Sequence, residues 1–229
     1  MHILILPGWR QYSEHWKIVS SILASQNVTH DVLDLPGFGN EPAQDTLTNA
    51  SEVAKWVTQY ITTHVPNTDI VLVGHSYGGR VAAHIAASKL DYIKGLVLIG
   101  SPNIYRPSIK VQCLKLLTKV LHPVIALAPE NFRSTFRSSD YTNVKGTPLE
   151  TLYSNIIVED QTRMLQTLSL PTHLIWGEND TQAPLSSAKE MCQLIPNASL
   201  EIITATGHDV HIEKPHLLTA KILSYVKTL

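Results

Sequence analysis

Residues 71–80 read VLVGHSYGGR, and this stretch decides the fold. A nearly continuous apolar run, residues 69–74, ends at a glycine, and a serine follows two positions later. Residues 77–89 then show the apolar spacing of a helix. The sequence therefore predicts a buried strand over 69–74, a sharp turn at Ser76 and a helix over 77–89.

The same alternation of strand and helix extends in both directions from this turn. Strands are also predicted at 2–6, 28–35, 94–100, 171–176 and 199–204. Helices are predicted at 13–26, at 48–64 with Thr48 as N-cap, at 184–195 and at 214–228. Strands that are apolar almost throughout are typical of sheets with helices on both faces. The predicted fold class is α/β, with a doubly wound, mostly parallel sheet.

One interval interrupts this alternation of strands and helices. Residues 101–170 contain no strand-like run, although 109–121 and 147–167 have helical spacing. This favours an insertion between two strands of the sheet. The predicted core comprises residues 1–102 and 168–229, and the insertion comprises residues 103–167.

Composition limits the classes of function. A chain of 229 residues with 44% hydrophobic content suits one core, and a formal net charge of -1 gives no sign of nucleic-acid or anionic-membrane binding. Cys113 and Cys192 match no metal or redox motif, which indicates free thiols and a cytoplasmic location. The start, MHILILPG, is typical of a buried strand rather than a signal peptide. Lysines and a proline interrupt the apolar stretch around 111–128, so no membrane span is expected.

Three interpretations compete for the glycine-rich turn. A phosphate-binding loop needs lysine and a hydroxyl residue where this chain has Arg80 and Val81, so that interpretation fails. A turn without chemistry is the structural alternative. The third is a nucleophile elbow, G-x-S-x-G, which requires the strand and helix predicted here.

The glycines of the elbow have a steric purpose. Side chains at Gly74 and Gly78 would collide with neighbouring elements, and Gly79 lets the helix pack close to the strand. Ser76 would then present its hydroxyl at the carboxyl end of the sheet. The backbone N–H of Tyr77 faces the same space from a helix N-terminus.

A serine nucleophile needs a base and a group that orients the base. His208 in ATGHDVHIEKP (205–215) is the candidate base, with His211 as its competitor. Asp180 in WGEND (176–180) is the candidate acid, with Glu178 and Asp209 as alternatives. Two further residues receive structural roles: Asp34 is expected to hold the following loop by accepting backbone hydrogen bonds, and His75 is expected to pack beside the elbow.

No metal or cofactor is expected. His208 and His211 form a poor metal site without further ligands, and no H-E-x-x-H motif occurs. Gly37 and Gly39 are followed by Pro42 where a dinucleotide fingerprint needs a third glycine.

Over essentially its whole length, the chain resembles the α/β-hydrolases. LPGW (6–9), DLPGFGNEP (34–42), GHSYGG (74–79) and the pair WGEND and TGHDVHIEKP match motifs of that family in order. The order Ser76, Asp180, His208 is also that of the family. The resemblance implies an α/β-hydrolase core with a helical lid at 103–167.

The resemblance also implies a reaction. Ser76 would attack a carboxylic ester or thioester and form an acyl-enzyme, with His208 as base and Asp180 holding it. The backbone N–H groups of Trp9 and Tyr77 would form the oxyanion hole. The chain departs from the family at Pro7-Gly8, where many members have His-Gly.

The expected partner is a small-molecule ester or thioester, and the expected state is monomer or homodimer. Two alternatives stay open: a lyase or C–C hydrolase using the same triad, and a ligand receptor with little turnover. Some apolar side chains of the insertion are expected to line an acyl pocket. The candidates are Ile104, Tyr105, Leu114, Leu117, Val120, Leu121, Ile125, Phe132, Phe136, Tyr141, Leu152 and Tyr153.

Overall fold

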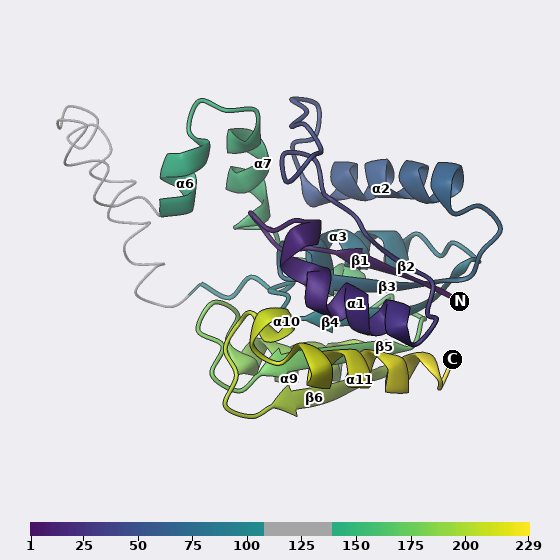
Figure 1. Cartoon of the computed structure of the whole chain (residues 1–229). Coiled ribbons are helices and arrows are strands. Elements are labelled where there is room, and N and C mark those ends of the chain that lie inside the picture. The colour runs from purple at the N-terminus through teal and green to yellow at the C-terminus, as the bar shows by residue number, and fades with distance from the viewer. Residues whose placement is uncertain (108–138) are drawn as a thin grey trace.

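The computed structural model describes residues 1–107 and 139–229, and its centre is one six-stranded sheet (Figure 1). The strand order is β2-β1-β3-β4-β5-β6, and every neighbouring pair is parallel. This confirms the predicted fold class. The strands are β1 (His2–Leu6), β2 (His30–Val32), β3 (Ile70–His75), β4 (Ile93–Ile99), β5 (Thr172–Gly177) and β6 (Ala198–Ile203).

Side chains alternate between two cores because successive residues of a strand point to opposite faces. In β1, Ile3 and Ile5 pack into one core, whereas Leu4 and Leu6 pack into the other. The helices on the first face are α1 (Lys17–Ser25), α10 (Val210–Glu213) and α11 (Pro215–Val226), with the 3-10 helix η1 (Ser13–Trp16). The helices on the second face are α2 (Ala50–His64), α3 (Tyr77–Ala87) and α9 (Leu185–Leu194).

Two predicted elements differ from those observed. The strand predicted at 28–35 is shorter, His30–Val32, because it lies at the sheet edge and pairs only with β1. The N-cap of α2 is Asn49 rather than Thr48, since the Asn49 side chain accepts the Glu52 N–H at 3.0 Å. Thr48 instead donates its N–H and hydroxyl to the Glu52 carboxylate.

The described part of the insertion is helical and lies between β4 and β5. It contains α6 (Ser139–Val144), α7 (Leu149–Ile156) and α8 (Thr162–Leu165). Helices α7 and α8 fall in the predicted stretch 147–167, whereas α6 was not predicted. Leu152, Ile156 and Leu165 are buried in the core on the α2–α3 face. The helix predicted at 109–121 lies outside the described residues. The boundaries of a separate lid at 103 and 167 stay a prediction.

The strand order reverses between β1 and β3. Because β1 pairs with β2 on one side and β3 on the other, the loops after β1 and β3 diverge to opposite faces of the sheet. Ligands of open α/β sheets bind at the carboxyl ends of the strands beside such a reversal. Trp9 follows β1 and Ser76 follows β3, so this position of the sheet is where the site should be sought.

Candidate active site

Ser76 occupies a strained turn between β3 and α3. Its backbone angles, φ of 49° and ψ of -115°, form a combination that a residue with a side chain rarely adopts. Backbone hydrogen bonds hold it there: Ser76 N–H donates to the Ile99 carbonyl at 2.9 Å, and the Ser101 hydroxyl donates to the Ser76 carbonyl at 2.9 Å. The turn is therefore fixed by β4 and the residues after it.

The glycines around Ser76 permit close approach of backbone, as predicted. A Cβ at Gly74 would lie 2.5 Å from the Gly79 Cα, and one at Gly78 would overlap the Leu6 carbonyl. A Cβ at Gly79 would overlap the Ser101 side chain. Each glycine thus removes an atom that the strand-to-helix turn cannot accommodate.

The structure brings His208 and Asp180 together in a buried pair. Asp180 follows β5, His208 follows β6, and His208 Nδ1 lies 2.8 Å from Asp180 Oδ2. The other Asp180 oxygen accepts the N–H groups of Gln182 at 2.9 Å and Ala183 at 2.8 Å. Because a carboxylate only accepts hydrogen bonds, this contact places the proton of His208 on Nδ1.

The rejected alternatives for acid and base have other contacts. Glu178 is exposed and accepts the Ala205 N–H at 3.0 Å. Asp209 accepts a hydrogen bond from Gln11. His211 is buried against Trp16, with ring centroids 4.3 Å apart. Asp34 binds the N–H groups of Ser13 and Asn40, which is the loop-holding role predicted for it.

Ser76 and His208 line the same two cavities, of about 430 Å³ and about 330 Å³. No hydrogen bond joins their side chains in the part of the chain that the structure describes. Catalytic hydrogen bonds are often long before substrate is bound, so the shared cavity is the relevant observation.

Trp9 and Tyr77 line the larger of these two cavities together with Ser76. Their rings meet edge to face with centroids 5.4 Å apart, and the Trp9 ring also contacts Tyr153 of α7 at 5.1 Å. Within residues 1–107 and 139–229, neither backbone N–H donates a hydrogen bond. Both donors are therefore available to a ligand.

The larger cavity also tests the predicted pocket residues. Ile104, Tyr105 and Tyr153 line it, whereas Leu152 packs in the core. The candidates from Leu114 to Phe136 lie outside the described residues. Ile156 and Ile157 line the cavity as well, although no sequence pattern selects them.

Sequence patterns missed Gln11. Its side-chain oxygen accepts the Gly8 N–H at 3.2 Å, and its side-chain nitrogen donates to Asp209 at 2.9 Å. His75 Nδ1 lies 3.0 Å from the same Gln11 oxygen, and His75 Nε2 lies 3.1 Å from the His208 carbonyl. Gln11 and His75 thus connect the loops that carry Trp9, Ser76 and His208, through contacts that no local motif encodes.

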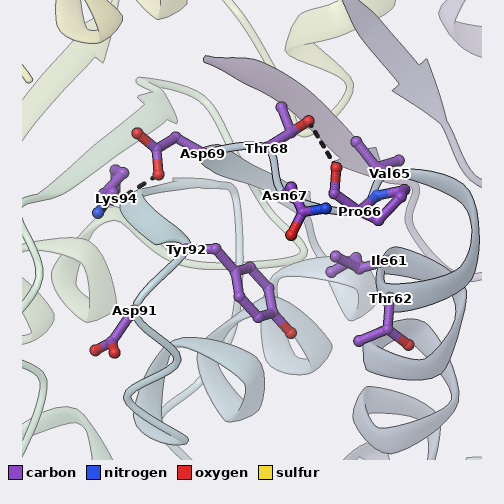
Figure 2. A pocket seen from close by; sticks show the side chains of 10 residues that line it. All are labelled: Ile61, Thr62, Val65, Pro66, Asn67, Thr68, Asp69, Asp91, Tyr92 and Lys94. Carbon is purple, nitrogen blue, oxygen red and sulfur yellow. Dashed lines mark hydrogen bonds and ion pairs between the residues drawn. The ribbon is translucent and has the colours of Figure 1, made fainter.

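Another cavity, of about 590 Å³, lies elsewhere (Figure 2). It is lined by residues before β3 and at the start of β4, at the amino ends of the strands. Its Lys94 and Asp69 are paired at 3.4 Å. It has no nucleophile placed beside a base, so the cavities at Ser76 are the better candidates.

Comparisons with known proteins identify the family and the fold of the chain. The model of the alpha/beta hydrolase family matches residues 3–221. A pimeloyl-(acyl-carrier protein) methyl ester esterase of Vibrio vulnificus is 25% identical, over 97% of this chain and 93% of the relative. An uncharacterized hydrolase of Bacillus subtilis, YugF, is 26% identical over 85% of this chain and 79% of the relative. A thermophilic esterase from Thermogutta terrifontis has the same fold, with a TM-score of 0.75 and 21% identity, over 100% of this chain and 90% of that one.

Proposed function

This chain belongs to the alpha/beta hydrolase family, and from that premise we propose that it hydrolyses a carboxylic ester or thioester through an acyl-enzyme formed on Ser76. Two further features support the proposal. Ser76 lies on a strained elbow at the carboxyl end of the sheet. A buried His208–Asp180 pair opens onto the same cavities.

The observation that carries the proposal is the 2.8 Å contact between His208 Nδ1 and Asp180 Oδ2. An ionised carboxylate accepts but cannot donate, so Nδ1 carries the proton and Nε2 keeps a lone pair. That lone pair is the base that a serine hydroxyl needs. Asp180 also stabilises the imidazolium that forms when the proton is taken.

The reaction then proceeds in two balanced halves. Ser76 Oγ attacks the carbonyl carbon while its proton moves to His208 Nε2, and His208 returns that proton to the departing alcohol or thiol. Water attacks the acyl-enzyme in the second half, giving its proton to His208. The acid leaves, and Ser76 recovers its proton.

The oxyanion of each tetrahedral intermediate needs donors. We assign them to the backbone N–H groups of Trp9 and Tyr77, which are unused by the described residues. Each such donor contributes about 3 kcal/mol to the barrier reduction. Backbone donors need no histidine at Pro7, so the departure from the family at that residue leaves this role intact.

Similarity to relatives supports the ester class. The relative from Vibrio vulnificus is, by its name, an esterase of a methyl ester, and that similarity covers 97% of this chain. The described part of the larger cavity combines Ile104, Ile156 and aromatic rings with the polar Arg80 and Gln182. This lining suits a small-molecule ester. We expect the protein to act without a cofactor, as a cytoplasmic monomer or homodimer.

A panel of p-nitrophenyl esters with acyl chains of increasing length tests the proposal, with the matching thioesters as a second panel. We expect turnover of at least one panel, and Ser76→Ala should reduce it by about three orders of magnitude or more while the protein stays folded. A lyase or C–C hydrolase would leave the panels largely untouched yet react with a fluorophosphonate at Ser76. A receptor with little turnover would hydrolyse neither panel.

A further inference from the structure

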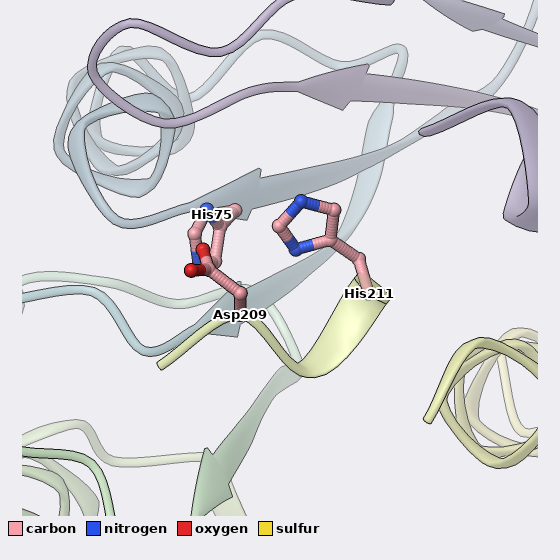
Figure 3. Close-up of side chains that lie close together, drawn as sticks. All are labelled: His75, Asp209 and His211. Carbon is pink, nitrogen blue, oxygen red and sulfur yellow. The ribbon is translucent and has the colours of Figure 1, made fainter. Parts of the chain in front are cut away.

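The side chains of His75, Asp209 and His211 lie close together (Figure 3). His75 ends β3, whereas Asp209 precedes α10 and His211 lies in it. One potential ligand atom from each residue lies within 4.8 Å of the others. The spacing of His208 and His211 gave no third ligand, because His75 reaches this place only through the fold.

His211 has a buried imidazole ring whose nitrogens are unpaired within the described residues. The residue is 1% exposed, and neither ring nitrogen has a hydrogen-bond partner among the described residues. Stacking on Trp16, with planes 8° apart, holds the ring in place. Burial lowers the pKa of His211 to about 3, so the ring is neutral at physiological pH and keeps a lone pair.

Both ring nitrogens of His75 face hydrogen-bond acceptors, but a neutral imidazole ring carries only one N–H. Its Nε2 faces the His208 carbonyl at 3.1 Å and its Nδ1 faces the Gln11 side-chain oxygen at 3.0 Å. The Gln11 amide cannot turn around, because its oxygen accepts the Gly8 N–H and its nitrogen donates to Asp209. Burial lowers the pKa of His75, which disfavours the doubly protonated ring. A neutral ring that donates from Nε2 therefore directs the Nδ1 lone pair at another acceptor.

We propose that His75, Asp209 and His211 bind one Zn²⁺ ion, distinct from the catalytic machinery. Two imidazoles and a carboxylate are a ligand set that zinc prefers, with water in the fourth position. The bond from His75 Nε2 to the His208 carbonyl is the outer-shell contact that metal-bound histidines usually make.

The site must contract slightly to bind the ion. Zinc ligands lie about 2.0–2.2 Å from the metal, so atoms 4.8 Å apart need to approach one another. Asp209 is the residue able to move, because it is only half-buried and precedes a helix of four residues. Asp209 and His75 also line the smaller cavity, of about 330 Å³, which gives an ion a route in.

Bound zinc should inhibit hydrolysis. His75 and Asp209 directly adjoin Ser76 and His208 in the chain, and the ion would take Asp209 and His75 Nδ1 from Gln11. The loops carrying the candidate nucleophile and base would then lose their shared contact. Inhibition through this site rests on the proposed function, but zinc binding does not and is measured without substrate.

Titration of ZnCl₂ into the metal-free full chain by calorimetry tests the site. We expect one ion per chain, with affinity reduced at least tenfold in His211→Gln and in Asp209→Asn. His216→Gln is the matched control, since His216 is exposed and absent from the cluster, and it should bind like wild type. His208→Ala should also retain binding, because its side chain is not a ligand here. With wild type, Zn²⁺ should inhibit ester hydrolysis and EDTA should reverse the inhibition.

Three results would overturn the proposal. The first is no saturable binding to wild type. The second is equal affinity for wild type and both cluster variants. The third is loss of binding in His208→Ala alone, which would place the ion on the candidate base. If His211→Gln fails to fold by circular dichroism, Asp209→Asn and the zinc-dependent rise in the melting temperature of wild type decide the outcome.

Discussion

At the scale of single residues, Ser76 and Asp180 are each held in place by hydrogen bonds from neighbouring residues. The turn at Ser76 costs of order 1–3 kcal/mol, and the hydrogen bonds to Ile99 and Ser101 offset that strain. Asp180 is fixed by the N–H groups of Gln182 and Ala183. Both groups are therefore positioned before substrate arrives.

Replacement of Asp180 by asparagine tests its assigned role. The amide would offer an N–H to His208 Nδ1, so the ring would carry its proton on Nε2 and could not accept the proton of Ser76. We expect Asp180→Asn to lower kcat by about 10³-fold or more with a small change in KM. Steady-state kinetics on the preferred ester measure both parameters.

Glu178→Gln is the matched control, because Glu178 lies two residues away but is exposed, and its side chain accepts the Ala205 N–H. It should keep nearly full activity. A large loss of activity in Glu178→Gln together with a small loss in Asp180→Asn would show that Glu178, and not Asp180, is the partner of His208.

At the scale of elements, the approach of α3 to β1 depends on a missing side chain. A Cβ at Gly78 would overlap the Leu6 carbonyl and lie 2.5 Å from the Pro7 oxygen, and both are backbone atoms that cannot move alone. We expect Gly78→Ala to lower the free energy of unfolding by about 3 kcal/mol, as severe overpacking does. Urea denaturation gives the value.

The control for this change is Gly146→Ala. Unlike Gly78, which lies inside helix α3, Gly146 has a positive φ, of 74°, and nothing lies within 4 Å of its added Cβ. Gly146→Ala should lower the free energy of unfolding by about 1 kcal/mol, which is the strain of a left-handed conformation alone. Equal losses in the two variants would show that the collision at Gly78 costs no more than the backbone strain at Gly146.

The insertion should set substrate length. Ile156 of α7 lines the larger cavity in addition to packing in the core, whereas Leu152 of the same helix packs in the core without lining the cavity. We expect Ile156→Ala to shift kcat/KM toward longer acyl chains, because truncation enlarges the cavity. Leu152→Ala should lower stability by about 2–5 kcal/mol and leave the preference unchanged. Equal shifts in both variants would mean that the cavity does not receive the acyl chain.

At the scale of the whole molecule, the periodicity of the sequence predicts the sheet and most helices well. Apolar strands such as Ile70–His75 are distinctive because helices bury both of their faces. Edge strand β2 is shorter than predicted, since residues beside it are apolar for reasons of loop packing: Leu33 and Leu35 lie in the core without extending the strand.

The candidate site is only partly predictable for a related physical reason. Ser76, Asp180 and His208 each follow a strand, so local pattern locates them. Gln11 and the cluster of His75, Asp209 and His211 depend on side chains that meet across the fold, as in the bond from Gln11 to Asp209. No local spacing encodes such contacts. The helices of the described chain also include none long and apolar enough to cross a membrane.

The central claim is that Ser76 is the nucleophile activated by His208. Mass spectrometry after reaction with a fluorophosphonate tests it most directly, because the probe bonds only to an activated hydroxyl and needs no knowledge of the substrate. We expect one adduct per chain on the peptide containing Ser76, absent in Ser76→Ala and formed far more slowly in His208→Ala. An adduct on a different residue, or none on wild type that hydrolyses esters, would contradict it.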